Sequence, residues 1–342
     1  MSGVASPSLD AAEEFLQRST LTTRVHSILR RYPAISPALV LLLAIIVFGQ
    51  VNPRFYLASN LSLIAQQVAV IGALAIGQTL IIITAGIDLS LGAVMVFTSV
   101  VMARTVVTFG LPGPAALVLG LAIGTAAGAL NGLLITRLKL PPFIITLGTF
   151  QIFGALTQLM SNGETVQEHQ IPAILLSTGQ PIQIGDVRIT TGVILMALMY
   201  VGVAWILRNT AWGRHVYAVG DDAEASRLAG IRSTRVVFSV YVVAGAIFAI
   251  AAWVLIGRVG GADPNAGANA NLDSITAVVI GGTSLFGGRG TLVGTLLGAL
   301  IVGVFHNGLT LAGVQSLYQT LAVGLLVIAA VAIDQWIRRV RT

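Results

Sequence analysis

The feature that most constrains this chain is a series of ten apolar stretches, most of them about 20 residues long. A helix rises about 1.5 Å per residue, so about 20 apolar residues cross the roughly 30 Å of hydrocarbon in a bilayer. Only 9% of the residues are charged, against roughly a quarter in a soluble domain. We therefore predict an all-α membrane protein, a polytopic helical bundle of about ten transmembrane segments. The expected segments are 34–51, 61–84, 90–108, 115–136, 143–161, 191–207, 236–256, 270–286, 291–311 and 317–336.

One of these stretches, 270–286, is short and interrupted by glycine. A helix of this length falls short of the full hydrocarbon thickness. We expect it to be a short or re-entrant segment, a half-helix that enters the bilayer and turns back.

The basic residues predict the orientation. With the N-terminus in the cytosol, alternation of the spans puts 15 of the 19 Lys and Arg residues in cytoplasmic segments. Basic residues concentrate in the cytoplasmic loops of membrane proteins. The four that fall outside are Arg54, Arg104, Arg188 and Arg258. We therefore predict that both termini are cytoplasmic, and that the net charge of +6 reflects topology rather than binding to nucleic acid.

The spans divide the chain into three parts. Residues 1–33 are predicted to form a cytoplasmic amphipathic segment, with a disordered tail as the alternative, because Ser8 can cap a helix with an apolar stripe. Residues 34–337 form the transmembrane domain. Residues 338–342 form a cytoplasmic tail.

Two of the predicted loops are long enough to have a function. Residues 162–190 are expected to lie outside, where the run 182–189 suggests a hairpin-like cap. Residues 208–235 are expected to lie inside and contain the densest mixture of charges in the chain. Such a loop between two clean spans usually contacts a partner. The alternative is a solvated connection.

Several chemistries lack the residues that they need. Cysteine is absent, and the four histidines lack metal-ligand spacing, so we expect neither a disulfide nor a metal site. A P-loop needs a lysine to reach the nucleotide phosphates. The single lysine is Lys139, and the glycine-rich run 281–289 ends in Arg289 instead. The chain is therefore not expected to hydrolyse ATP or to be an enzyme.

Asp88 is predicted to be the one acidic residue that lies between two spans in an otherwise uncharged stretch. A carboxylate at the bilayer centre costs about 2.5–3.5 kcal/mol on insertion scales. We interpret Asp88 as the cap of the following helix at a break in the chain. Direct contact with a substrate is the alternative.

Uncharged polar side chains inside the spans suggest a hydrophilic path. Amide and hydroxyl groups both donate and accept hydrogen bonds, which suits a neutral, hydroxyl-rich solute. The alternative is hydrogen bonding between helices. The candidate path residues are Gln78, Thr84, Asp88, Asn131 and Asn307.

Two patterns suggest internal organisation. Gly120, Gly124 and Gly128 have the spacing that lets helices approach closely, as do Gly294 and Gly298. The motif Asn-Gly-Leu at 131–133 recurs at 307–309, in spans predicted to run in opposite directions, as an inverted repeat requires. A second echo, between 86–92 and 282–288, implies a different offset. Both remain open at this point.

Three long motifs give the chain a family resemblance. The stretch 78–92, which contains GIDLS, resembles the GGIDLSVG motif of ribose/xylose/galactose-type ABC importer permeases. The stretch 272–300 is similar to a second motif of that family. The segment 218–231 resembles its VGGNxxAARLSGI segment, which forms the short helix that docks into the ATPase. The resemblance covers the chain from about residue 50 to the end.

The resemblance implies a membrane permease subunit that imports a monosaccharide. It implies an ATP-binding cassette subunit that uses the ATP, an extracytoplasmic sugar-binding protein, a second permease copy and the bacterial inner membrane. No cofactor is expected on this chain. An ion-coupled carrier of a small neutral solute is the alternative. The residues expected to couple to the ATPase are Asp221, Asp222, Glu224, Arg227, Leu228 and Gly230.

The chain departs from the family pattern at two places. Ala85 replaces the first glycine of the membrane motif. Asp221 and Asp222 replace a Gly-Asn pair at the start of the docking segment, which puts the choice of ATPase partner in doubt.

Overall fold

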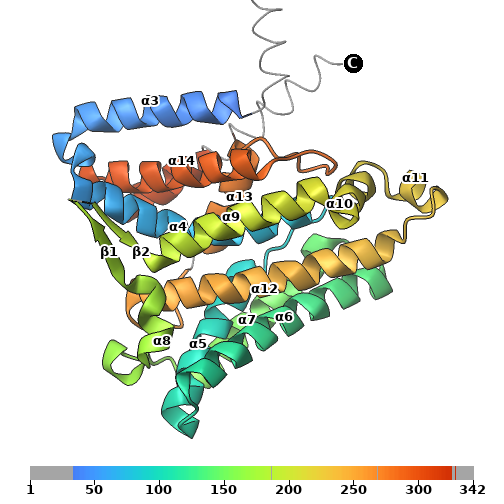
Figure 1. Cartoon of the computed structure of the whole chain (residues 1–342), viewed down its shortest axis with the longest axis horizontal. Helices are drawn as coiled ribbons and strands as arrows, with labels where there is room; N and C mark the ends of the chain where they lie inside the picture. The colour runs from blue at the N-terminus through green and yellow to red at the C-terminus, as the bar shows by residue number, and fades with distance from the viewer. Residues whose placement is uncertain (1–33, 186, 268, 326–327, 329–342) are drawn as a thin grey trace, which may run out of the picture.

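The computed structural model describes residues 34–185, 187–267, 269–325 and 328. The expected amphipathic segment and the C-terminal tail lie outside these residues, together with much of the tenth predicted span. Within the described part the chain is a bundle of helices with one small hairpin (Figure 1).

The helices follow the predicted apolar stretches. Each of the first nine stretches contains a helix, and residues 317–325 of the tenth are helical. Seven described helices are long and apolar enough to cross a membrane, whereas α3 and α13 are shorter. The elements are α3 (Ile35–Val51), η1 (Pro53–Tyr56), α4 (Ala58–Ile83), α5 (Leu91–Phe109), α6 (Gly113–Leu138), α7 (Pro142–Ser161), η2 (Glu168–Gln170), α8 (Ala173–Leu176), η3 (Ser177–Gly179), β1 (Pro181–Ile184), β2 (Val187–Thr190), α9 (Thr191–Asn209), α10 (Ala211–Asp221), α11 (Ala223–Leu228), α12 (Ser233–Val259), α13 (Ala270–Ile280) and α14 (Leu292–Leu311).

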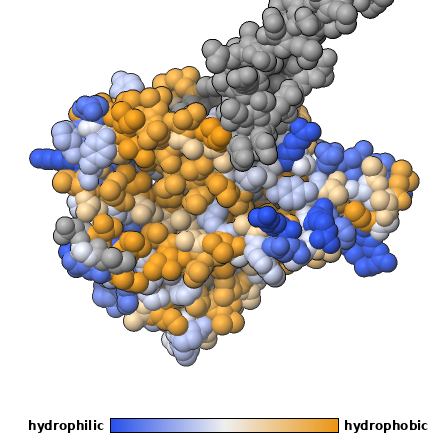
Figure 2. Space-filling model, turned by 45° about the horizontal axis from the view of Figure 1, so that its top comes forward, coloured by the Kyte–Doolittle hydropathy of each residue, from blue (hydrophilic) through white to orange (hydrophobic). Residues whose placement is uncertain are grey.

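The two long loops lie at opposite ends of the bundle (Figure 1). One end carries α8 and the antiparallel pair of β1 and β2, so the hairpin predicted over 182–189 is confirmed. We call it the hairpin end. The other end carries α10 and α11, and we call it the docking end. Figure 2 shows apolar side chains gathered on the face between polar ends, as a membrane protein requires.

Glycine allows two pairs of helices to pack closely. Between α6 and α12, a Cβ on Gly128 would lie 2.2 Å from the carbonyl oxygen of Tyr241. Between α14 and α13, a Cβ on Gly298 would lie 1.8 Å from the carbonyl oxygen of Ala277. Since neither position has room for a side chain, the packing role predicted from the glycine spacing is confirmed.

The bundle contains an inverted repeat. Adding 176 residues, the offset between Asn131 and Asn307, moves α4 onto 234–259, where α12 lies. The same offset moves α6 onto 289–314, which contains α14. The competing offset of 196 would place α4 across the break that follows α12. The Asn-Gly-Leu motif therefore marks the repeat.

The paired helices α4 and α12 run in opposite directions. Near the start of α4, Ser62 accepts a hydrogen bond from Arg188 of the hairpin, and its last residue, Ile83, lies against α10. At the start of α12, Ser233 donates to Ala223 of α11. Toward its other end, Gly257 lies against Gly179 beside the hairpin. This is the geometry of an inverted repeat.

The eighth segment does not turn back. Ala262 pairs with Val166 at the hairpin end, and Gly281, after α13, lies against Gly294 at the start of α14. The segment therefore runs from one end of the bundle to the other, as non-helical chain and then an 11-residue helix. The prediction of a short segment is confirmed, and the contacts at both ends of the bundle favour a crossing over the re-entrant alternative.

Candidate functional site

The docking end presents a short, well-capped helix, α11. The side chain of Asp222 accepts hydrogen bonds from the backbone N–H groups of Glu224 and Ala225, each at 2.9 Å. Asp and Asn are equally good N-caps, so replacing the family's Asn keeps the cap. The helix ends at Leu228, and Gly230 follows its C-cap residue with a φ of +86°, which favours glycine.

The side chains of α11 project into solvent. Arg227 Nε donates to Glu224 Oε2 at 3.0 Å, and this hydrogen bond lowers the pKa of Glu224. Both side chains are about two-thirds exposed, so the pair contributes little to stability. Leu228 is 79% exposed, the apolar tip of this helix. These residues have no structural task that explains their exposure, which is what a docking surface requires.

Backbone contacts join the docking end to both repeats. A Cβ on Gly220, near the end of α10, would lie 1.7 Å from the carbonyl oxygen of Ile83, the last residue of α4. Gly288 donates its N–H to the same oxygen at 2.9 Å. Tyr217 Oη donates to the carbonyl of Gly290 at 2.9 Å. The run 281–289 is thus a place of close backbone contact, and a displacement of α10 would reach α4 and the α13–α14 loop directly.

The departure at Ala85 has a structural explanation. Ala85 has a φ of +59°, in the left-handed region, and follows Thr84, the C-cap residue of α4. This conformation costs an L residue about 1–2 kcal/mol and costs glycine nothing. Glycine in the family motif therefore suits the backbone here, and alanine accepts the strain.

Asp88 lies in the break between α4 and α5, with 1% of its surface exposed. Its Oδ1 accepts from the backbone N–H and from the hydroxyl of Ser90, both at 2.6 Å. Asn131 of α6 donates to the same hydroxyl at 2.8 Å. Ser90, and not Asp88, is the N-cap residue of α5. Asp88 therefore fixes Ser90, the residue that precedes α5, and Ser90 in turn connects to Asn131 of α6.

The five predicted path residues do not form one site. Asp88 and Asn131 meet through Ser90, but Thr84, the residue that follows α4, donates to the carbonyl of Ile81 in that helix. Asn307 exchanges two hydrogen bonds with Asn60 of α4, at 2.8 and 2.9 Å, as the interhelical alternative predicts. The amide of Gln78 is buried, and neither of its polar atoms has a partner among the described residues. All five are buried within the single chain.

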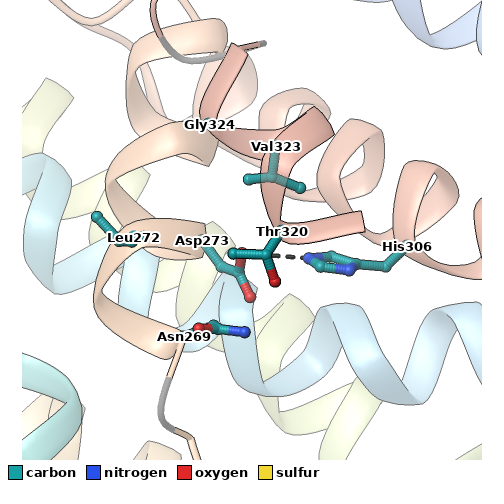
Figure 3. A pocket seen from close by; sticks show the side chains of 7 residues that line it. All are labelled: Asn269, Leu272, Asp273, His306, Thr320, Val323 and Gly324. Atoms are coloured by element: carbon teal, nitrogen blue, oxygen red, sulfur yellow. Dashed lines mark hydrogen bonds and ion pairs between the residues drawn. The ribbon is translucent and has the colours of Figure 1, made fainter. Parts of the chain in front are cut away.

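A second acidic residue lies inside the bundle and was missed. Asp273 of α13 is 8% exposed, and its Oδ1 lies 3.2 Å from His306 Nε2 of α14 (Figure 3). Asp88 lies between two spans, as expected, and Asp273 adds an acidic residue within a predicted span. The signal was an aspartate inside the apolar stretch 270–286. The pair faces a cavity of about 160 Å³ whose other lining residues are Asn269, Leu272, Thr320, Val323 and Gly324.

These features together define a class of protein. An apolar helical bundle built as an inverted repeat, with polar groups inside and, at one end, a helix (α10) that contacts both halves and leads into an exposed short helix (α11), has the organisation of a transport permease. The model of the family described as "Branched-chain amino acid transport system / permease component" matches residues 60–331. The chain belongs to this family, whose members are membrane permeases and not themselves enzymes.

Relatives match over most of their length. The fructose import permease protein FrcC of Rhizobium meliloti is 48% identical over 98% of this chain and 95% of its own. The ribose import permease protein RbsC of Bacillus subtilis is 39% identical over 88% of this chain and 92% of its own. The D-allose transport system permease protein AlsC of Escherichia coli is 33% identical over 88% of this chain and 91% of its own. No solved structure matches the chain.

Proposed function

We propose that this chain is the membrane subunit of an ATP-driven importer of a monosaccharide. The observation that carries the proposal is the identity of 48% with a fructose permease over nearly the whole chain. The family description mentions branched-chain amino acids, but the relatives compared above are named for sugars. Because full-length identity is the closer comparison, we favour the sugar and take fructose as the first to test.

The importer needs partners for its energy and its substrate. The chain has no P-loop of its own, so an ATP-binding cassette subunit supplies the hydrolysis, docked on α11 in the cytosol. An extracytoplasmic binding protein delivers the sugar at the hairpin end. The five polar candidates are buried within one chain and do not line an open path. A second copy of the permease therefore completes the translocation path, between the two copies. The bacterial inner membrane is the expected location.

Orientation is tested with single cysteines, because the chain has none of its own. Gly179 lies in the external loop but is unsuitable, since its Cβ would lie 1.9 Å from a carbonyl oxygen. We expect Gln183→Cys in β1, which is exposed, to react with an impermeant thiol reagent in sealed cells. Ala225→Cys, exposed on α11, should react only after the cells are opened. The reverse labelling pattern would invert the proposed topology.

Transport is tested with the permease reconstituted in vesicles together with its ATP-binding cassette subunit and its sugar-binding protein. Uptake of labelled fructose should require ATP and the binding protein, and an uncoupler should leave it unchanged. Ribose, allose and leucine are the competitors. Uptake of leucine alone would support the other branch of the family. Uptake driven by an ion gradient without ATP would establish the secondary carrier instead.

A further inference from the structure

The cavity beside Asp273 and His306 lies between three helical segments. Asp273 comes from α13, His306 from α14, and Thr320 from the helical residues that follow α14 (Figure 3). Leu272, also in the lining, is 57% exposed, so the cavity reaches the surface of the single chain. Leu321 and Leu325, on the same helical segment as Thr320, are each about 60% exposed, so this segment presents apolar side chains at its surface.

The inverted repeat allows the position of Asp273 to be compared with the equivalent position in the first repeat. The offset of 176 pairs position 273 with Phe97 of α5, and α7 with the segment that contains Thr320. Phe97 packs against Phe153 of α7, with ring centroids 5.6 Å apart. One repeat therefore fills this contact with aromatic rings. The other places a carboxylate there and leaves a cavity. Because the fold accommodates a large apolar side chain at this position, packing does not account for Asp273.

An ionisable pair largely buried among apolar spans requires a reason. Acidic and histidine side chains within membrane spans are costly, and they usually mark a substrate or ion pathway. The lining here combines carboxylate, imidazole, amide and hydroxyl groups with the aliphatic side chains of Leu272 and Val323. A small-molecule site is commonly apolar with a few placed polar groups. A monosaccharide has a complementary surface, because its ring presents C–H groups on its faces and hydroxyl groups at its edge.

We propose that this cavity is a contact site for the transported monosaccharide, with Asp273 as the residue that accepts hydrogen bonds from the hydroxyl groups of the sugar. A carboxylate offers two oxygens. One of them lies 3.2 Å from His306, which holds the carboxylate in place as a positioning residue. Leu272 and Val323 pack against the ring. The inference rests on the proposed import of a monosaccharide and adds the place where the permease contacts it.

The test replaces Asp273 in two ways within the full transporter. Asp273→Asn keeps the size of the side chain and removes the charged acceptor, which should lower sugar uptake about tenfold or more. Asp273→Phe installs the side chain of the other repeat, and should fill the cavity and abolish uptake. Leu317→Phe, on the same segment as Thr320 but outside the lining, adds an equal ring and should transport normally. Leu317 is 80% exposed.

A second measurement separates sugar contact from a structural role. The amount of each variant in the membrane and the ATP hydrolysis of the complex without sugar should stay at the level of the parent. His306→Gln, which keeps a hydrogen-bond donor, should shift the relative uptake of fructose, ribose and allose. If Asp273→Asn lowers membrane abundance and basal hydrolysis together with uptake, the role is structural and the proposal is overturned. Normal uptake of all three sugars by both Asp273 variants overturns it as well, while import itself stands. Failure of the unaltered transporter to import any monosaccharide overturns both.

Discussion

Replacing Leu228 with Asp is expected to abolish uptake without unfolding the permease. Leu228 is 79% exposed at the tip of α11, so the substitution removes no internal contact and places a charge where an apolar side chain would enter a partner. A buried, unpaired charge at an interface costs several kcal/mol, roughly 2–5 when a buried charged pair is broken. Association with the ATPase subunit should fall by a factor of about a hundred or more, measured by co-purification from membranes, and uptake should fall with it.

Replacing both Glu224 and Arg227 with Ala should weaken coupling less than Leu228→Asp does, because these two side chains already bind each other on the exposed face of α11. Thr234→Asp is the matched control for Leu228→Asp. It adds the same charge at the docking end, in the first turn of α12, where a helix N-terminus tolerates an acid. A Leu228→Asp permease that retains its ATPase and transports normally would show that docking lies elsewhere.

The structure changes the ranking of the coupling residues for a specific reason. Charge and spacing directed attention to Glu224 and Arg227. Sequence could not show that these two side chains bind each other, or that Leu228 is the more exposed residue. The capping role of Asp222, in contrast, follows from local sequence, because a cap involves only the next three residues.

Local pattern predicted most of the helices because a chain in lipid must satisfy its backbone within each segment. Contacts between distant segments left no such pattern. Ile83, Gly220 and Gly288 meet through backbone atoms. In a chain with many glycines, nothing in the sequence marks Gly220 and Gly288 as contact positions. The Asp273–His306 pair joins two helices in the same way. Each residue alone looks like an isolated polar residue in an apolar stretch.

Asp88 and Asp263 occupy matching breaks, one after α4 and one after α12. Asp88 Oδ1 accepts from the backbone N–H of Ser90, two residues on, and Asp263 Oδ1 accepts from that of Asn265. The two aspartates therefore form the same local turn in the two repeats. They differ in burial, since Asp88 is buried and Asp263 is partly exposed. This difference provides a matched pair for the last prediction.

We expect Asp88→Asn to retain most uptake and Asp88→Leu to lose it. The amide oxygen of Asn can still accept from both donors of Ser90. Leu leaves those donors unpartnered inside the bundle, at about 1–3 kcal/mol each, and breaks the connection through Ser90 to Asn131. Asp263→Leu should cost less, because water can replace the lost acceptor at a partly exposed site. Uptake is measured for each variant with and without an uncoupler, at constant ATP. If Asp88→Asn were as damaging as Leu and uptake collapsed with the ion gradient, the charge itself would be the functional element, and ion coupling would replace the ATP-driven mechanism.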